Sequence, residues 1–390
     1  MALASLVQTA LVFLVVVRVA DSTTAPIVDL GYAQYQGVVD TKLNVTAFRG
    51  IRYAAPPTGK HARYDVGSAS QYNGAELVQE SNNQVVVVII QYRLGLFGFL
   101  SGQQMKDDGA LNAGLLDQEF ALRWVNKNIF RFGGDPDKVT IWGESAGAGS
   151  VVQHIIAHDG KTSPSSSERR SPVRPSCLPN LNTTTKSLRH AVFNEVAAQA
   201  GCNGTKPLDC LRAVDGATMA DINLNVDLAR FHGTFVFLPV IDNSFITQGP
   251  TDALSQGQLN GDILLAVANT NEGILFVNQS VEHNVAEYVR NLFPLFGAEE
   301  SNTAAVAYAS LGSPLDQVNV IMGEAIFVCP TFLLLDAFPG ASWKGEYAIP
   351  PALHGQDIIN YFPSFTAFNS TLIYNNTAFI NAFLGCSSRS

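Results

Sequence analysis

The chain has 390 residues, of which 47% are hydrophobic and 15% are charged, so it can bury the large core of a globular protein. Its formal net charge is −9 and no long basic run occurs in the part expected to fold, which argues against a nucleic-acid partner. The length would suit two or three average domains, but α/β folds often reach it as one.

The N-terminus carries an apolar run from about Leu11 to Val17, followed by small and polar residues. The run is too short to span a bilayer, so we interpret residues 1–22 as a secretory signal peptide. No basic residue precedes the run and Arg18 follows it, which leaves a buried helix as the alternative. We expect residues 23–390 to form a single secreted domain without stable membrane insertion.

Acceptor sites for N-glycosylation support an extracellular location. Asn-x-Ser/Thr occurs at Asn44, Asn182, Asn203, Asn278, Asn369 and Asn375. Any one of these could be accidental, but together with the N-terminal run they are typical of a secreted glycoprotein.

Five cysteines leave at least one unpaired. Cys202 and Cys210 are close enough in sequence to close a small loop, whereas Cys177, Cys329 and Cys386 have no obvious partner. The spacing fits no zinc pattern, so we expect no metal.

Strand-like and helix-like stretches alternate along the chain. Residues 84–91 form a continuous β-branched run, as expected of a strand buried on both faces, and residues 262–268 repeat this pattern. Between them, residues 114–129 are periodic like an amphipathic helix and residues 138–142 alternate like a strand. The order predicts an α/β fold with one doubly wound, mostly parallel sheet.

A serine stands where the strand pattern of 138–142 ends and a helical pattern begins. Gly143, Ala146 and Gly147 surround Ser145 with almost no side-chain volume, so the helix can cross close to the strand with the serine hydroxyl outward. This arrangement predicts a nucleophile elbow. The alternative is a serine that merely caps the helix, which would not explain the flanking glycines.

A serine nucleophile needs a base and an acid that orients the base. Glu272 directly follows the buried strand 262–268, where chemistry gathers in doubly wound sheets, although a surface acid in a turn is the commoner case. Of seven histidines, His354 has the most suitable position, in a loop before a predicted helix at 357–362; spacing alone leaves this choice open. If the pKa of His354 is that of an unperturbed imidazole, we expect activity to fall as the ring protonates near pH ~6–7.

Residues 132–147, FGGDPDKVTIWGESAG, resemble the active-site signature of the type-B carboxylesterase/lipase family of α/β-hydrolases. Similar stretches occur at residues 48–59, 91–100 and 271–273 and at His354-Gly355, so the resemblance covers most of residues 26–162 and 191–383.

The resemblance implies an α/β-hydrolase fold and hydrolysis of carboxylic esters, with no cofactor. It assigns Ser145 as nucleophile, Glu272 as acid and His354 as base, and it pairs Cys202 with Cys210 in a disulfide. The N–H of Ala146 would be one donor of the oxyanion hole.

The chain departs from the family in three places. The His-Gly-Gly-Gly loop that supplies the other oxyanion donors is absent, because near residues 60–64 the segment before that loop joins directly to the segment after it. Residues 163–190 are poor in apolar side chains where the family has a core strand, and resemble a passage in a shifted frame or a disordered insert. The sequence after Phe383 stops short of the family's C-terminal part.

We therefore expect a secreted esterase or lipase acting on small-molecule or lipid esters. The alternative is a catalytically inactive family member, either a binding module or the product of a damaged gene. The sequence indicates neither the acyl nor the alcohol preference, nor an oligomeric state.

Overall fold

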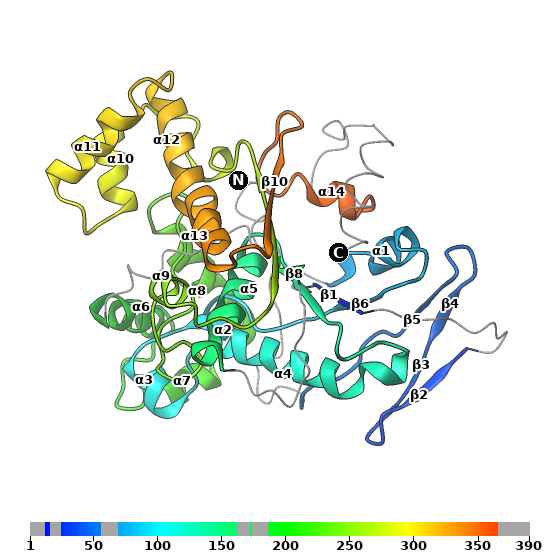
Figure 1. Cartoon of the computed structure of the whole chain (residues 1–390). Coiled ribbons are helices and arrows are strands. Elements are labelled where there is room, and N and C mark those ends of the chain that lie inside the picture. The colour runs from blue at the N-terminus through cyan, green and yellow to red at the C-terminus, as the bar shows by residue number, and fades with distance from the viewer. Residues whose placement is uncertain (1–11, 16–24, 56–68, 162–171, 174–185, 366–390) are drawn as a thin grey trace.

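The computed structural model describes residues 12–15, 25–55, 69–161, 172–173 and 186–365 (Figure 1). Within these ranges the predicted α/β architecture is confirmed, with strands in the order β6-β1-β7 in one three-stranded sheet and β10-β9-β8 in another. The strands are β1 Val12–Val15, β6 Val86–Ile89, β7 Thr140–Trp142, β8 Pro172–Val173, β9 Ile263–Asn269 and β10 Ser342–Tyr347. Two small antiparallel pairs precede them, β2 Ile27–Asp29 with β3 Gln34–Gln36 and β4 Val38–Asp40 with β5 Val45–Ala47.

Within the two three-stranded sheets, the strands are parallel except for β1. Both β8 and β10 pair in parallel with β9. In contrast, β1 lies between β6 and β7 and is antiparallel to both, so β6 and β7 are parallel to each other but separated by one strand. The N-terminal apolar run therefore supplies a strand of this sheet. The rest of the predicted signal peptide lies outside the described residues, and its removal stays a prediction.

The side chains of strand β6 pack against helices on both faces of the β6-β1-β7 sheet. Val86 and Val88 pack against helix α4 on one side, while Val87 and Ile89 pack with α1 and α14 on the other. This two-residue alternation, apolar in both directions, is what a strand buried on both faces requires. Helix α5 also lies on the α4 side, where its apolar residues join α9 and α13 in one core cluster.

The helices around the sheets have the following bounds. They are α1 Gly74–Glu80, α2 Gly95–Phe99, α3 Gln103–Asp108, α4 Ala113–Asn128, α5 Ala146–Ile156, α6 Lys186–Gln199, α7 Pro207–Ala213, α8 Gly216–Leu228, α9 Pro250–Ser255, α10 Val285–Leu292, α11 Ala298–Tyr308, α12 Pro314–Gly323, α13 Cys329–Ala337 and α14 Ile358–Tyr361. The predicted helix 114–129 corresponds to α4 and the predicted helix 357–362 to α14.

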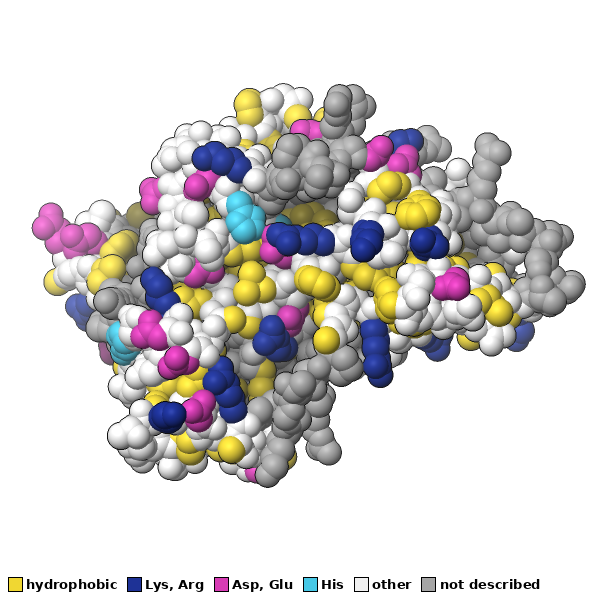
Figure 2. All heavy atoms as spheres, turned by 90° about the horizontal axis from the view of Figure 1, so that it is seen from below, with side chains coloured by type: hydrophobic (Ala, Val, Ile, Leu, Met, Phe, Trp, Pro, Cys, Tyr) yellow, Lys and Arg dark blue, Asp and Glu magenta, His cyan; other side chains and the backbone are white. Residues whose placement is uncertain are grey.

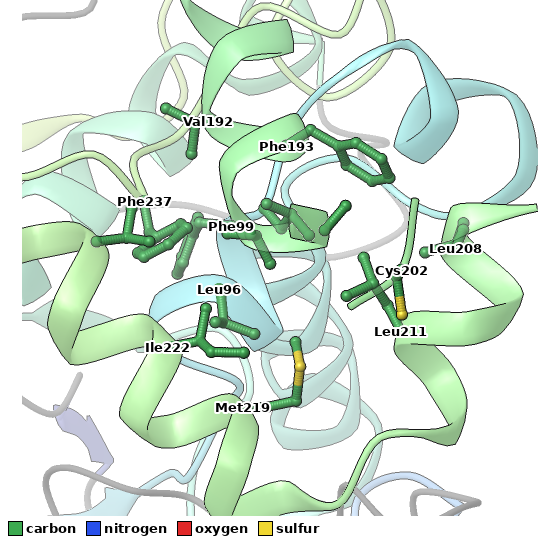
Figure 3. Packing of buried hydrophobic residues seen from close by; sticks show 14 of the residues in the cluster. Leu96, Phe99, Val192, Phe193, Cys202, Leu208, Leu211, Met219, Ile222 and Phe237 are labelled. Carbon is green, nitrogen blue, oxygen red and sulfur yellow. The ribbon is translucent and has the colours of Figure 1, made fainter. Parts of the chain in front are cut away.

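A second core lies away from the sheets, between α2 and helices α6 to α8. Figure 3 shows Phe99, Phe193 and Met219 packed there, close to Cys202. Cys202 and Cys210 form a disulfide, as the family resemblance implied. Cys329 is a free, exposed thiol, and Cys177 and Cys386 lie outside the described residues.

Helices α12 and α13 join through a π-helical turn, Glu324–Val328, into one rod from Pro314 to Ala337. By length and composition alone, this is the one helix among the described residues that could cross a membrane. Of its 18 most apolar consecutive residues, 44% are buried inside the protein. Core helices of soluble proteins reach the same length and hydropathy, so this helix is weak evidence for a membrane span. The rod borders the lobe formed with α10 and α11 in Figure 1 and packs against β9 and β10 through α13.

The surface features named in the sequence are only partly within the described residues. Asn44, Asn203 and Asn278 are exposed, and the other three glycosylation acceptors lie outside. Of residues 163–190, the structure describes the two-residue strand β8 and the first residues of α6. Figure 2 shows basic and acidic side chains interspersed with hydrophobic ones on the face viewed from below.

Candidate active site

Ser145 lies at the sharp turn between β7 and α5, as the sequence predicted. Its backbone has φ 52° and ψ −121°, a left-handed conformation that a serine adopts only under constraint, and its side chain is buried. The helix begins at Ala146, so the Ala146 N–H is one of the helix-terminal amides that have no intrahelical acceptor. This strand, turn and helix have the geometry of a nucleophile elbow.

Gly143 is what allows the helix to cross the strand so closely. A Cβ atom at this position would lie 2.3 Å from the backbone C and O atoms of Gly147, and backbone cannot yield as a flexible side chain can. The Gly147 N–H in turn donates to the Glu144 carbonyl at 2.8 Å, which closes the turn. Any side chain at position 143 therefore has to displace the elbow.

We predict that Gly143→Ala lowers the free energy of unfolding by about 1–3 kcal/mol, as expected of overpacking against rigid atoms. It should also slow labelling of Ser145 by a fluorophosphonate. Gly204→Ala is the matched control, because a Cβ at this exposed glycine would have no atom within 4 Å. Equal unfolding temperatures and labelling rates for the two variants would contradict the assigned role of Gly143.

Glu272 and His354 meet in a buried contact. The Nδ1 atom of His354 lies 2.5 Å from Glu272 Oε2, and the side chains are 6% and 2% exposed. The other carboxylate oxygen of Glu272 accepts a hydrogen bond of 2.6 Å from the Asn269 N–H. Glu272 is thus a buried carboxylate with both oxygens engaged, and not a surface acid in a turn.

Asparagines fasten the Glu272 loop to the His354 loop. The Asn269 side chain donates to the Leu353 carbonyl at 2.6 Å, and the Asn271 side chain donates to the Pro351 carbonyl at 2.8 Å. The Asn271 N–H also donates to the Ala352 carbonyl at 2.9 Å. These bonds extend the pairing of β9 with β10 beyond the strand ends and tie the two loops together.

Glu144, which precedes the candidate nucleophile, reaches the opposite side of the imidazole. Its Oε1 atom lies 3.2 Å from His354 Nε2. The two atoms are in ion-pair range but are not aligned for a hydrogen bond, so Nε2 has no hydrogen-bond partner among the described residues. The contact brings the elbow and the His354–Glu272 pair together, with a carboxylate on each side of the ring.

These two carboxylates control the protonation of His354. Burial by itself lowers the pKa of His354, but the negative charges of Glu144 and Glu272 prevail and raise it to about 9. Burial raises the pKa of Glu144 to about 7, although the neighbouring imidazolium acts in the opposite direction. The facing carboxylates thus favour the protonated ring, so the pKa of His354 lies above that of an unperturbed imidazole.

We predict that Glu144→Gln lowers the pKa of His354, because the amide keeps the shape but removes one of the two facing charges. An NMR titration of the His354 ring protons should show a midpoint near pH 9 in the parent chain and a lower midpoint in the variant. Glu119→Gln serves as control, since Glu119 contacts His158 Nε2 at 3.0 Å instead. A midpoint that does not move in Glu144→Gln would show that this carboxylate does not act on the base.

Sequence reasoning did not identify Glu144, Phe276 or Phe327, the last two of which pack against the His354 ring. Of these three residues, only Glu144 could have been found from the sequence, because it lies inside the GESAG motif next to the serine. Within the described residues, no group of three or more His, Cys, Asp or Glu side chains is placed to hold a metal ion.

The elbow, the paired loops and the helices on both faces define an α/β hydrolase. The model of the carboxylesterase family matches residues 61–307. The chain is 32% identical to carboxylesterase patB of Aspergillus clavatus over 77% of its own length and 56% of that protein. It is 29% identical to the secreted triacylglycerol lipase LIP1 of Gibberella zeae over 77% of the chain and 58% of that lipase. The crystal structure of Aspergillus niger EstA superposes with a TM-score of 0.80 and 25% identity, covering 93% of this chain and 89% of EstA.

The chain therefore belongs to the carboxylesterase family. It spans between half and two thirds of the length of these two curated relatives.

Proposed function

We propose that the chain is a secreted, glycosylated hydrolase of carboxylic esters in which Ser145, His354 and Glu272 form the catalytic triad. The observation that carries the proposal is the buried contact of His354 with Glu272, 2.5 Å long, placed beside the residue that precedes Ser145. Relatives named carboxylesterase and secreted triacylglycerol lipase support the reaction class and the location. The exposed acceptors Asn44, Asn203 and Asn278 support glycosylation.

In the proposed reaction, the Ser145 hydroxyl attacks the ester carbonyl while His354 Nε2 takes the hydroxyl proton. Glu272 holds Nδ1 and stabilises the imidazolium, and the Ala146 N–H donates to the developing oxyanion. The tetrahedral intermediate then expels the alcohol, which takes the proton from Nε2. A water activated by the same nitrogen hydrolyses the acyl-serine and restores the free serine.

We predict that Ser145→Ala reduces ester turnover by about 10⁴–10⁶-fold, the order found when a triad nucleophile is removed. A fluorophosphonate should label Ser145, as peptide mass spectrometry of the modified chain can verify. Ser150→Ala is the control, since this buried serine on the same helix accepts a hydrogen bond from Gln118, away from His354. Labelling at another serine, or full turnover without the Ser145 hydroxyl, would remove the assignment.

A second candidate function, an inactive member of the family, is favoured by the missing His-Gly-Gly-Gly loop. Each oxyanion donor is worth about 2.7–4 kcal/mol in the transition state, so Ala146 alone would leave turnover lower by about 10⁴-fold or more.

We predict that the 390-residue chain hydrolyses p-nitrophenyl esters far more slowly than a version carrying a His-Gly-Gly-Gly segment grafted from a relative, by about 10⁴-fold. The comparison uses both proteins at the same pH and folded concentration. Equal turnover would mean that the chain has another oxyanion donor.

A further inference from the structure

The rod Pro314–Ala337 contains one π-helical turn, Glu324–Val328, which is wider than an α-helical turn by one residue. In the turn Glu324–Val328 the Cys329 N–H donates to the Glu324 carbonyl, five residues back instead of four. Pro330 explains the position, because a proline inside a helix has no N–H and its ring collides with the carbonyl four residues before it, here Ile326. The wide turn relieves this collision without ending the helix, and such turns are frequent at functional sites.

The wide turn sets Phe327 against the imidazole of His354. The two ring centroids lie 4.5 Å apart at an interplanar angle of 42°, and Phe327 is only 2% exposed. Phe276 contacts the same imidazole at 5.0 Å and Phe327 at 5.3 Å, so the three rings form one cluster. The Thr331 hydroxyl donates to the Phe327 carbonyl at 2.8 Å and thereby satisfies a backbone acceptor within the wide turn.

Helix α12, in the same rod, also packs against the loop that carries Glu272. A Cβ atom on Gly323 would lie 3.5 Å from the Glu272 Cβ, and one on Gly273 would lie 1.9 Å from the Asn319 carbonyl oxygen of α12. Beyond this contact a cavity of about 400 Å³ is lined by Glu272, the start of the wide turn and β10. The cavity borders Glu272, whereas the His354 ring is contacted by Phe327 and Phe276.

A hydrogen bond at Nδ1 alone does not fix an imidazole, because the ring can still pivot about that bond and swing Nε2 out of line. We propose that Phe327, held out of α-helical register by the wide turn at Pro330, is a positioning residue that keeps His354 aimed at the elbow. The catalytic consequence of this role rests on the proposed function. The contact between Phe327 and His354 orients the imidazole whether or not esters are hydrolysed.

The test is proton NMR of the intact chain, in which a short His–carboxylate hydrogen bond gives a far-downfield Nδ1 proton signal. Phe327→Leu removes the ring but keeps an apolar side chain. Pro330→Ala removes the ring that displaces the Ile326 carbonyl, so the turn can return to α-helical hydrogen bonding, and the tighter winding would rotate Phe327 by about 100° away from the imidazole. Both variants should broaden the signal beyond detection or lose it through solvent exchange.

Phe245→Leu is the matched control. Phe245 is 1% exposed and contacts the rings of His154 and His158 at 5.3 and 5.2 Å, so its replacement removes an equally buried ring from histidines outside the site. The downfield signal should persist in this variant. A signal that persists in Phe327→Leu and Pro330→Ala, or that is lost equally in Phe245→Leu, would overturn the proposal.

A second measurement separates this proposal from the proposed function. In the chain carrying the grafted oxyanion segment, Phe327→Leu should lower kcat by about 10²-fold with KM unchanged, the cost of misplacing a catalytic group by about 1 Å. If the grafted chain hydrolyses no ester, the proposed function fails while the NMR result still decides the role of Phe327. If it does and kcat is unaffected, the positioning role is wrong.

Discussion

The hydrogen bond between His354 and Glu272 is the constraint around which this part of the fold is organised. It joins residues 82 positions apart, in loops after two neighbouring parallel strands, and both side chains are buried. A buried carboxylate or imidazolium without a partner is strongly unfavourable, so each group requires the other. The asparagine bonds between the loops, the ring cluster over the imidazole and the glycine contacts with α12 all hold this one pair in register.

The placement of Glu144 changes how the pair is to be understood. A histidine with one carboxylate neighbour is oriented by it, whereas His354 has carboxylates near both ring nitrogens and is stabilised as a cation. The elbow sequence thus carries an electrostatic element as well as the serine, because Glu144, next to Ser145, raises the pKa of His354.

Much of this arrangement could be predicted from the sequence because it is local. The β-branched strand at 84–91, the helix at 114–129 and the glycines around Ser145 are each dictated by periodicity or by steric limits on a short stretch. Glu272 was accessible because it directly follows a buried strand, while His354 needed the family resemblance. The contact of Glu144 with His354 depends on tertiary folding, and the aim of Phe327 depends on a one-residue change of helical register, neither of which periodicity reveals.

The antiparallel strand β1 has a consequence for the order of events in the cell. Val12–Val15 lies within the predicted signal peptide and is also the strand between β6 and β7. One segment cannot occupy both places at the same time. If the leader is cleaved, β6 and β7 are left two strand spacings apart, about 9.6 Å, and must close or recruit another strand. If residues 1–22 act as the predicted signal peptide, export and folding would compete for the same four residues of β1.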